Sequence, residues 1–290
     1  MRLSIQNWIV EKYDDKTQIE MISRAGFKYC DWQFNVFMGR NDFGIKNDLD
    51  TINYYTDLKK KFDECDLTVW MTHALYPIYA EGDEFDEKLS KLKMCFIGSG
   101  ILNAKYIIVH PLMPHKWQGE QNRALRLDEN IKFYNSLTGW AKEYNVNICI
   151  EDMFGTWMGY GKYNETSCSR YEEMLEIYNG LDEKEYFSFC YDSGHSNMNY
   201  KDHNTDMVYA LGSNIKTVHL HDNDNAHDYH RLPGQGKTKW ENVFKALDDV
   251  GFDGVYNFEI NPNCLKGINK QKSLTKIHDD LEKFLSKYEN

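Results

Sequence analysis

The sequence predicts a (β/α)₈ barrel, an α/β fold in which eight parallel strands alternate with helices. Short apolar, β-rich runs alternate with longer amphipathic runs about eight times, and such alternation is typical of parallel βαβ units. The chain has 290 residues, close to the roughly 250 that this barrel typically needs. No Pro/Gly/Ser-rich linker or low-complexity tract divides it. We therefore expect a single domain over residues 1–290.

Each expected element follows from its hydrophobic pattern. The apolar runs predict strands at Leu3–Trp8, Tyr29–Phe34, Leu67–Thr72, Tyr106–His110, Val146–Glu151, Phe187–Tyr191, Ile215–His221 and Val255–Glu259. The amphipathic runs predict helices at Thr17–Ala25, Asp50–Cys65, Glu84–Leu102, Arg126–Glu143, Tyr171–Asn179, Trp240–Val250 and Gln271–Lys287, with a short one within Asp202–Leu211. An open doubly wound sheet is the alternative, but no GxGxxG follows the first strand, which disfavours a dinucleotide site.

The composition favours a folded protein that acts on small molecules. Hydrophobic residues make up 41% of the chain, which supports a sizeable core. The net charge is -11, and an acidic surface repels phosphate backbones, so we expect no nucleic-acid partner. The chain contains no stretch of about 18 apolar residues, so we expect no membrane span. The seven cysteines contain no CxxC pair and the N-terminus has no signal-peptide core, which predicts a reducing, cytoplasmic location.

The most informative segment is His219-Leu-His221-Asp222, followed closely by Asp228 and His230. Alternate side chains of a strand share a face, so His219 and His221 are expected to point the same way. Imidazole and carboxylate groups together are typical ligands of a divalent metal such as Zn, Mn or Co. A polar, solvated loop with scattered histidines is the alternative interpretation.

Metal-binding residue types also follow the other strands from the third to the eighth, where active sites of such barrels gather. One such residue after a strand is more often a structural loop residue, but six at one topological position form a pattern. Carboxylates that converge in a barrel mouth repel each other unless a cation neutralises them. A divalent metal is therefore expected near the strand ends that carry His73, His110, Glu151, Asp192 with His195, His219 and Glu259.

These motifs resemble the xylose-isomerase-like TIM-barrel superfamily, in particular its sugar and sugar-phosphate isomerase/epimerase branch. The resemblance covers most of the chain, in the family's order, and it identifies the superfamily better than a substrate. The matching pieces are Ile150-Glu151, Asp192-Ser193-Gly194-His195, Val218-His219-Leu220-His221-Asp222, Asp228-Tyr229-His230, Pro233-Gly234-Gln235-Gly236 and Phe258-Glu259.

The resemblance implies one divalent metal, with Mn the first expectation and Mg, Co or Zn as alternatives, held by Glu151, Asp192, His219 and Glu259. It implies proton transfer beside a carbonyl through an enediolate, with Glu151 and Glu259 as the acid/base pair. The partner would be a small sugar or sugar phosphate, and a homo-oligomer would be ordinary. The expected substrate-binding residues are His73, His110, His195, His221, Asp228, His230 and Arg231.

Two relatives in the same superfamily keep other functions open. The apurinic endonucleases with a trinuclear zinc site would map their ligands onto His73, His110, Glu151, Asp192, His195, His219, Asp228, His230 and Glu259. The net charge of -11 argues against DNA as the substrate. The metal-dependent subunit that cleaves C-glycosides uses a similar enolisation. A non-catalytic sugar-binding barrel is a further alternative, but it would not need both Glu151 and Glu259.

Overall fold

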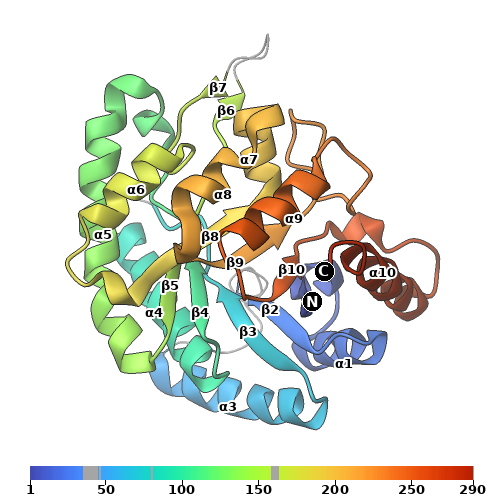
Figure 1. Ribbon diagram of the computed structural model, residues 1–290. Coiled ribbons are helices and arrows are strands. Elements are labelled where there is room, and N and C mark those ends of the chain that lie inside the picture. Colours follow the sequence, from blue (N-terminus) through green and yellow to red (C-terminus); the bar gives the residue numbers. More distant parts are fainter. Residues whose placement is uncertain (35–44, 46, 80, 158–162, 290) are drawn as a thin grey trace.

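The computed structural model describes residues 1–34, 45, 47–79, 81–157 and 163–289. Eight parallel strands close into a barrel in the order β1-β10-β9-β8-β5-β4-β3-β2, and helices surround it (Figure 1). The strand β1 pairs with β10 on one side and β2 on the other, which closes the sheet. The predicted (β/α)₈ barrel is confirmed.

The barrel elements agree closely with the predicted ones. The barrel strands are β1 Leu3–Gln6, β2 Tyr29–Gln33, β3 Thr68–His73, β4 Tyr106–Val109, β5 Asn147–Glu151, β8 Phe187–Asp192, β9 Ile215–Leu220 and β10 Tyr256–Phe258. The helices are α1 Asp15–Ala25, α3 Asp48–Glu64, α4 Asp83–Ile101, α5 Arg123–Tyr144, α6 Tyr171–Asn179, α7 Ser193–Tyr200, α8 Asp206–Leu211, α9 Trp240–Asp249 and α10 Lys270–Leu285.

The structure departs from the predicted elements in three places. The first strand ends at Gln6 rather than Trp8, and a short 3-10 helix spans Asn7–Val10. At this point the Asn7 side-chain oxygen accepts the Gln33 backbone N–H at 2.7 Å, a hydrogen bond that links the end of β1 to β2. The helix α7 and the small antiparallel hairpin of β6 (Thr156–Trp157) and β7 (Tyr163–Asn164) were not predicted.

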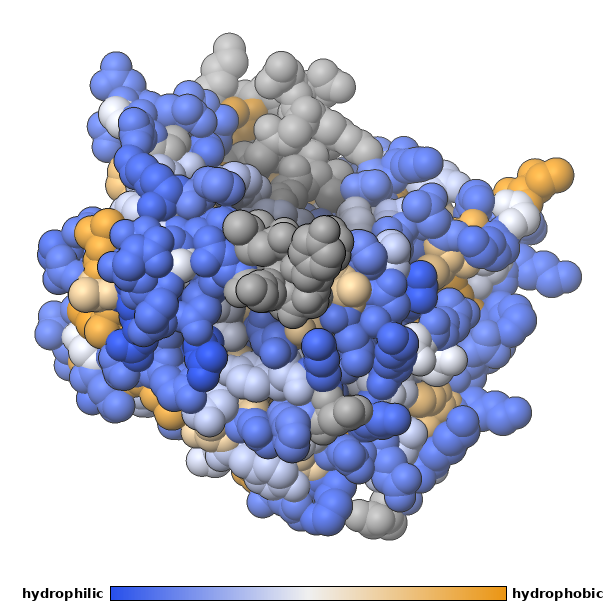
Figure 2. Space-filling model, turned by 90° about the horizontal axis from the view of Figure 1, so that it is seen from above, coloured by the Kyte–Doolittle hydropathy of each residue, from blue (hydrophilic) through white to orange (hydrophobic). Residues whose placement is uncertain are grey.

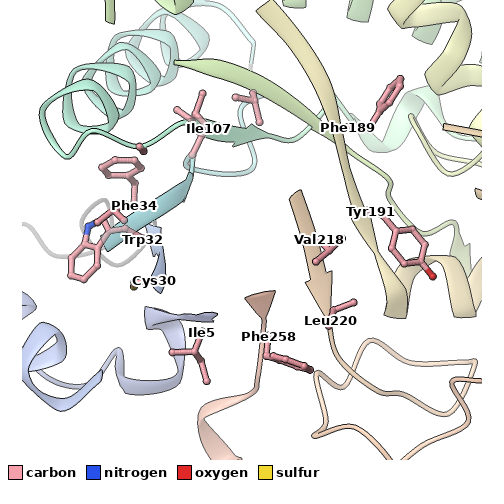
Figure 3. Close-up of a cluster of buried hydrophobic side chains, with 14 of the residues drawn as sticks. Ile5, Cys30, Trp32, Phe34, Ile107, Phe189, Tyr191, Val218, Leu220 and Phe258 are labelled. Atoms are coloured by element: carbon pink, nitrogen blue, oxygen red, sulfur yellow. The ribbon is translucent and has the colours of Figure 1, made fainter. Parts of the chain in front are cut away.

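Strand alternation sorts side chains between the barrel interior and the helical shell. Along β9, Val218 and Leu220 belong to the large apolar core that includes helix residues, whereas His219 lies at the inner face among the carboxylates described below. Figure 3 shows Val218 and Leu220 on β9, near Tyr191 of the neighbouring strand β8. The inner face is thus left free for polar and metal-binding groups.

One part of the barrel interior is apolar. It holds a separate buried cluster of Trp70, Met71, Ile108, Cys149, Cys190 and Val255. All seven cysteines are unpaired thiols, and Cys149 and Cys190 of this cluster are fully buried. Burial raises the pKa of the Cys149 thiol to about 11, so it stays protonated and packs as a small hydrophobe.

A buried ion pair joins two helices of the shell. The Arg126 guanidinium of α5 donates to both carboxylate oxygens of Glu173 in α6, at 3.3 and 2.9 Å. Both side chains are almost fully buried. A fork of this kind fixes the relative position of two helices as well as neutralising both charges.

The face of the molecule shown in Figure 2 is dominated by hydrophilic residues, with small, separated hydrophobic patches. Among the residues that the structure describes, no helix is both long and apolar enough to span a bilayer.

Candidate metal centre

Four side chains meet at the carboxyl ends of neighbouring strands. Glu151 ends β5, Asp192 ends β8, His219 lies near the end of β9, and Glu259 directly follows β10. One ligand atom from each lies within 4.8 Å of all the others. The His219 Nδ1 atom is 2.7 Å from Glu151 Oε1, 3.0 Å from Glu259 Oε2 and 3.9 Å from Asp192 Oδ2.

The three distances from His219 Nδ1 bracket the separation of ligands around a small cation, and the shortest is also a hydrogen-bond distance. Two ligand atoms on one tetrahedral ion with bonds of about 2.0–2.2 Å lie roughly 3.3–3.6 Å apart. All four side chains are buried, and three buried carboxylates beside one imidazole repel each other unless a cation is present. The predicted metal ligands therefore do converge in a geometry that fits a divalent ion.

A second group of ligand type adjoins the first through Glu151. The other oxygen of this carboxylate, Oε2, is 3.3 Å from His73 Nε2 and 2.8 Å from His110 Nε2. Despite these distances, Oε2 is buried and lacks a well-aligned hydrogen bond from any described residue. A cation between the two histidines and Glu151 would satisfy that oxygen.

A third group lies on the opposite flank, where the loop after β9 folds back. Asp228 Oδ2 is 2.9 Å from His230 Nε2 and 3.5 Å from His195 Nε2. His221 Nε2 is 3.0 Å from Asp192 Oδ1, and its ring stacks on His230 at 4.0 Å. The predicted substrate-binding residues other than Arg231 thus form two groups that flank the central one.

The charges in the cluster stabilise each other. Burial raises the pKa of Glu151, but the facing His219 and His110 outweigh burial and hold this pKa well below its usual range. Burial likewise opposes ionisation of Glu259, and His219 and His230 again lower the pKa. Burial lowers the pKa of His110, which leaves a neutral imidazole able to bind a metal.

One carboxylate holds the loop that carries Asp228 and His230. The Asp222 side chain accepts five hydrogen bonds between 2.9 and 3.2 Å, four from backbone N–H groups and one from the Trp240 indole. A backbone ladder also pairs Asp222 with Arg231. This buried residue shapes the loop instead of facing the cluster.

Close packing places His221 against α7. A Cβ atom built on Gly194 would lie 1.9 Å from His221 Cε1. Only a glycine lets the helix approach the ring this closely, and the Asp192 side chain caps the same helix by accepting the His195 N–H at 2.7 Å. The segment Asp192-Ser193-Gly194-His195 therefore serves packing and ligand placement together.

Two buried acids next to the cluster were not predicted as site residues. Asp31 of β2 lies 3.2 Å from His219 Nε2. Asp152 accepts the Asp192 backbone N–H, and burial followed by the Asp192 charge raises its pKa well above the usual range. The sequence did contain a signal for Asp31. It is a carboxylate within the apolar run Tyr29–Phe34, and charged residues are rarely buried in a strand unless they are paired.

Aromatic side chains line the rim of the cluster. Tyr76 stacks on His110 at 4.6 Å, Phe154 lies 4.9 Å from His195, and Trp8 meets His230 edge-on at 5.1 Å. The predicted substrate residue Arg231 lies over the Tyr229 ring at 4.2 Å. Its described contacts are with Tyr229, Gln235 and Asp222, so it stays outside the three ligand groups.

A family model for xylose isomerase-like TIM barrels matches residues 19–285. The chain belongs to the xylose isomerase-like TIM-barrel family. This membership confirms the resemblance inferred from the motifs. An uncharacterised protein of Methanocaldococcus jannaschii is 26% identical over 198 residues, 65% of this chain and 63% of that protein. Another, of Sinorhizobium fredii, is 24% identical over 54% of this chain and 48% of its own length. The chain spans less than two thirds of either relative.

Solved structures share the fold over nearly the whole chain. A D-tagatose 3-epimerase-like protein has a TM-score of 0.74 at 20% identity and covers 99% of this chain and 98% of its own. The zinc-containing structure of IOLI protein has a TM-score of 0.76 at 17% identity, with both chains fully covered. A D-psicose 3-epimerase crystallised with D-fructose has a TM-score of 0.72 at 12% identity, over 97% and 98% of the two chains.

Proposed function

We propose that this protein is a metal-dependent isomerase or epimerase of a sugar or sugar phosphate. The observation that carries the proposal is the central group of Glu151, Asp192, His219 and Glu259, which combines three carboxylates and one imidazole within 4.8 Å. Family membership and fold likeness to sugar epimerases support it. Epimerisation needs an acid and a base besides a metal, and the group contains two glutamates.

The residues present fit one divalent cation. Glu151, Asp192, His219 and Glu259 would hold it, with Mn our first choice and Mg, Co and Zn as alternatives. When bound, such an ion polarises a carbonyl or hydroxyl oxygen and lowers the energy of an enediolate. The zinc bound in the similarly folded IOLI structure supports the choice of a divalent metal.

In this proposal the two glutamates transfer protons on opposite faces of a sugar carbon. Glu151 and Glu259 come from β5 and β10, and β8 and β9 lie between these strands in the barrel order. One glutamate removes the proton beside the carbonyl, and the other, after taking up a proton from solvent, returns it from the opposite side, which inverts the configuration.

His195 is held ready to bind a substrate oxygen. Its Nδ1 atom is 2.7 Å from the Asp152 backbone oxygen, so this nitrogen carries the proton and Nε2 faces the cluster. The same space is surrounded by His73, His110, His221, Asp228 and His230, with Arg231 at its edge.

The remaining parts of the proposal concern partners and location. We propose that the partner is a small sugar rather than a nucleic acid, and a homo-oligomer is our working assumption. The seven free thiols are compatible with the proposed reducing, cytoplasmic environment.

Proton exchange tests this proposal directly. The protein loaded with Mn should exchange solvent deuterium into the carbon beside the carbonyl of a free or phosphorylated ketose. Glu151→Gln and Glu259→Gln should each reduce turnover at least about 10²-fold, with metal content checked in each variant. Glu129→Gln, at a partly exposed position of α5 outside the cluster, is the matched control and should keep full activity. Turnover without deuterium incorporation, or near-full activity of both metal-loaded site variants, would contradict the mechanism.

A multinuclear phosphodiesterase is the second candidate, because the two flanking groups offer further metal positions. His73, His110 and Glu151 form one group, and His221, Asp228 and His230 form the other. Elemental analysis distinguishes the candidates. One metal per chain supports the isomerase, whereas three zinc ions per chain together with hydrolysis of a phosphodiester supports the phosphodiesterase.

A further inference from the structure

Asp31 lies inside the barrel in the middle of β2 and is fully buried. Its Oδ2 atom accepts hydrogen bonds from Gln6 Nε2 at 2.9 Å and from Asn257 Nδ2 at 3.3 Å. Asn257 in turn accepts the Ser4 hydroxyl at 3.0 Å. Side chains from β1 and β10 therefore fix the carboxylate in one orientation, which faces His219 on β9.

The two ring nitrogens of His219 face different surroundings. Nδ1 points at the carboxylates of Glu151 and Glu259, at 2.7 and 3.0 Å. Nε2 is 3.2 Å from Asp31 Oδ2, and it has no well-aligned hydrogen-bond partner among the described residues. A buried N–H without an acceptor costs about 1–3 kcal/mol, and among described residues Asp31 is the carboxylate within reach of Nε2.

We propose that Asp31 is a positioning residue, which accepts the Nε2–H of His219 and thereby directs the Nδ1 lone pair into the group formed with Glu151, Asp192 and Glu259. A neutral imidazole has one donor nitrogen and one acceptor nitrogen, so a proton held on Nε2 leaves Nδ1 free to bind a cation. A carboxylate behind a metal-binding histidine also raises its basicity.

The geometry explains why Asp31 occupies the barrel interior. Gln6 and Asn257 supply donors to Oδ2 alone, and Oδ1 is buried without a hydrogen-bond partner among the described residues. A purely structural polar network would satisfy both oxygens. The hydrogen bonds instead hold Oδ2 behind His219, 3.2 Å from Nε2.

This inference rests on the proposed metal site, so the test measures metal binding rather than turnover. Affinity for Mn and Zn is determined by competition with a chromophoric chelator for the wild type, Asp31→Ala, Asp31→Asn and the control Thr72→Val. Thr72 is equally buried in β3, but its hydroxyl bonds Ser99 at 2.7 Å and does not meet the cluster. The second readout is the imidazole N–H resonance of His219 in the zinc-loaded protein.

We expect Asp31→Ala to weaken metal binding about 10- to 100-fold, and Asp31→Asn to weaken it less, because an amide oxygen can still accept Nε2–H. Thr72→Val should leave the affinity unchanged. The slowly exchanging Nε2–H resonance should be present in the wild type and lost in Asp31→Ala.

Three results would overturn the inference. Equal metal affinity of the wild type and both Asp31 variants would refute the positioning role while leaving the metal site standing. Equal weakening in Thr72→Val would assign the effect to general destabilisation. A wild type that binds no divalent metal would refute the proposed function together with the inference. If Asp31→Ala does not fold, Asp31→Asn carries the comparison.

Discussion

The contact between Gly194 and His221 predicts the outcome of adding one methyl group. In Gly194→Ala the new Cβ would lie 1.9 Å from His221 Cε1 and 2.5 Å from Nε2. Ordinary contact begins near 3.4 Å, so the ring or the start of α7 must move by about 1.5 Å. The ring has little room, because it is fully buried and stacks on His230 at 4.0 Å.

The expected loss follows from these contacts. Overpacking of a dense site costs about 1–3 kcal/mol. Moving the ring also breaks the 3.0 Å contact between His221 Nε2 and Asp192, and an unsatisfied buried polar group costs about 1–3 kcal/mol. Together they predict a loss of roughly 2–6 kcal/mol, or a Tm lower by roughly 4–24 °C at about 2–4 °C per kcal/mol.

Thermal unfolding of the metal-free protein, followed by circular dichroism, measures this loss. Gly139→Ala in α5 is the control, because nothing lies within 4 Å of its added Cβ, and it should stabilise the helix by up to about 1 kcal/mol. In the double variant Gly194→Ala/His221→Ala the clash is absent, so the two effects should be less than additive. A Gly194→Ala protein as stable as the wild type, or strict additivity in the double variant, would refute the reasoning.

Three further predictions concern pH, packing and partners. Burial lowers the pKa of His230, but Asp228 and Glu259 outweigh it and raise the pKa to about 9. The metal-free protein should therefore lose stability as pH rises from about 6.5 to 9, while its metal affinity rises over the same window. A Tm that does not change with pH, measured by thermal unfolding in the presence of a chelator, would count against this expectation. Glu173→Leu leaves the buried Arg126 without its partner and should cost about 3–5 kcal/mol in denaturant unfolding. Glu129→Ala, which removes a partly exposed ion pair with Lys132, should cost at most about 1 kcal/mol, and equal losses in the two variants would argue against this prediction. Anisotropy titration with abasic duplex DNA should show no specific binding, since the net charge is -11, and tight, salt-sensitive binding would overturn the expectation.

The barrel was predictable because its strands are continuous apolar runs. Ile107-Ile108-Val109 and Ile148-Cys149-Ile150 carry the signal of strands buried on both faces. The helix α7 was not predictable in the same way. It begins directly after Asp192 with Ser193-Gly194-His195, which reads as a turn, and the helix exists because Asp192 caps it and because Gly194 lets it lie against His221.

The central ligand group could be predicted from the order of the strands and from the residue types at their ends. The residues that hold this group in place, Asp31 and Asp222, could not. Glu151, Asp192, His219 and Glu259 each close a recognisable strand, and parallel strands bring their carboxyl ends together. Asp31 closes no apolar run; it interrupts one, and its relation to His219 depends on which strands become neighbours of β1. The hydrogen bonds by which Asp222 holds its loop could not be predicted either, because their donors are backbone N–H groups, which every residue except proline carries.

The anchoring of the loop by Asp222 separates two kinds of change that this chain could tolerate. The barrel supplies Glu151, Asp192, His219 and Glu259 from its strands, whereas Asp228 and His230 are held by a segment that is anchored by the Asp222 carboxylate with its five donors and by the backbone pairing with Arg231. Residues between the anchor points can be exchanged without disturbing the strands beneath. Divergent members of such a family could therefore acquire new chemistry by changes in this one segment, and a graft of residues 224–233 from a relative is a practical route to altered specificity.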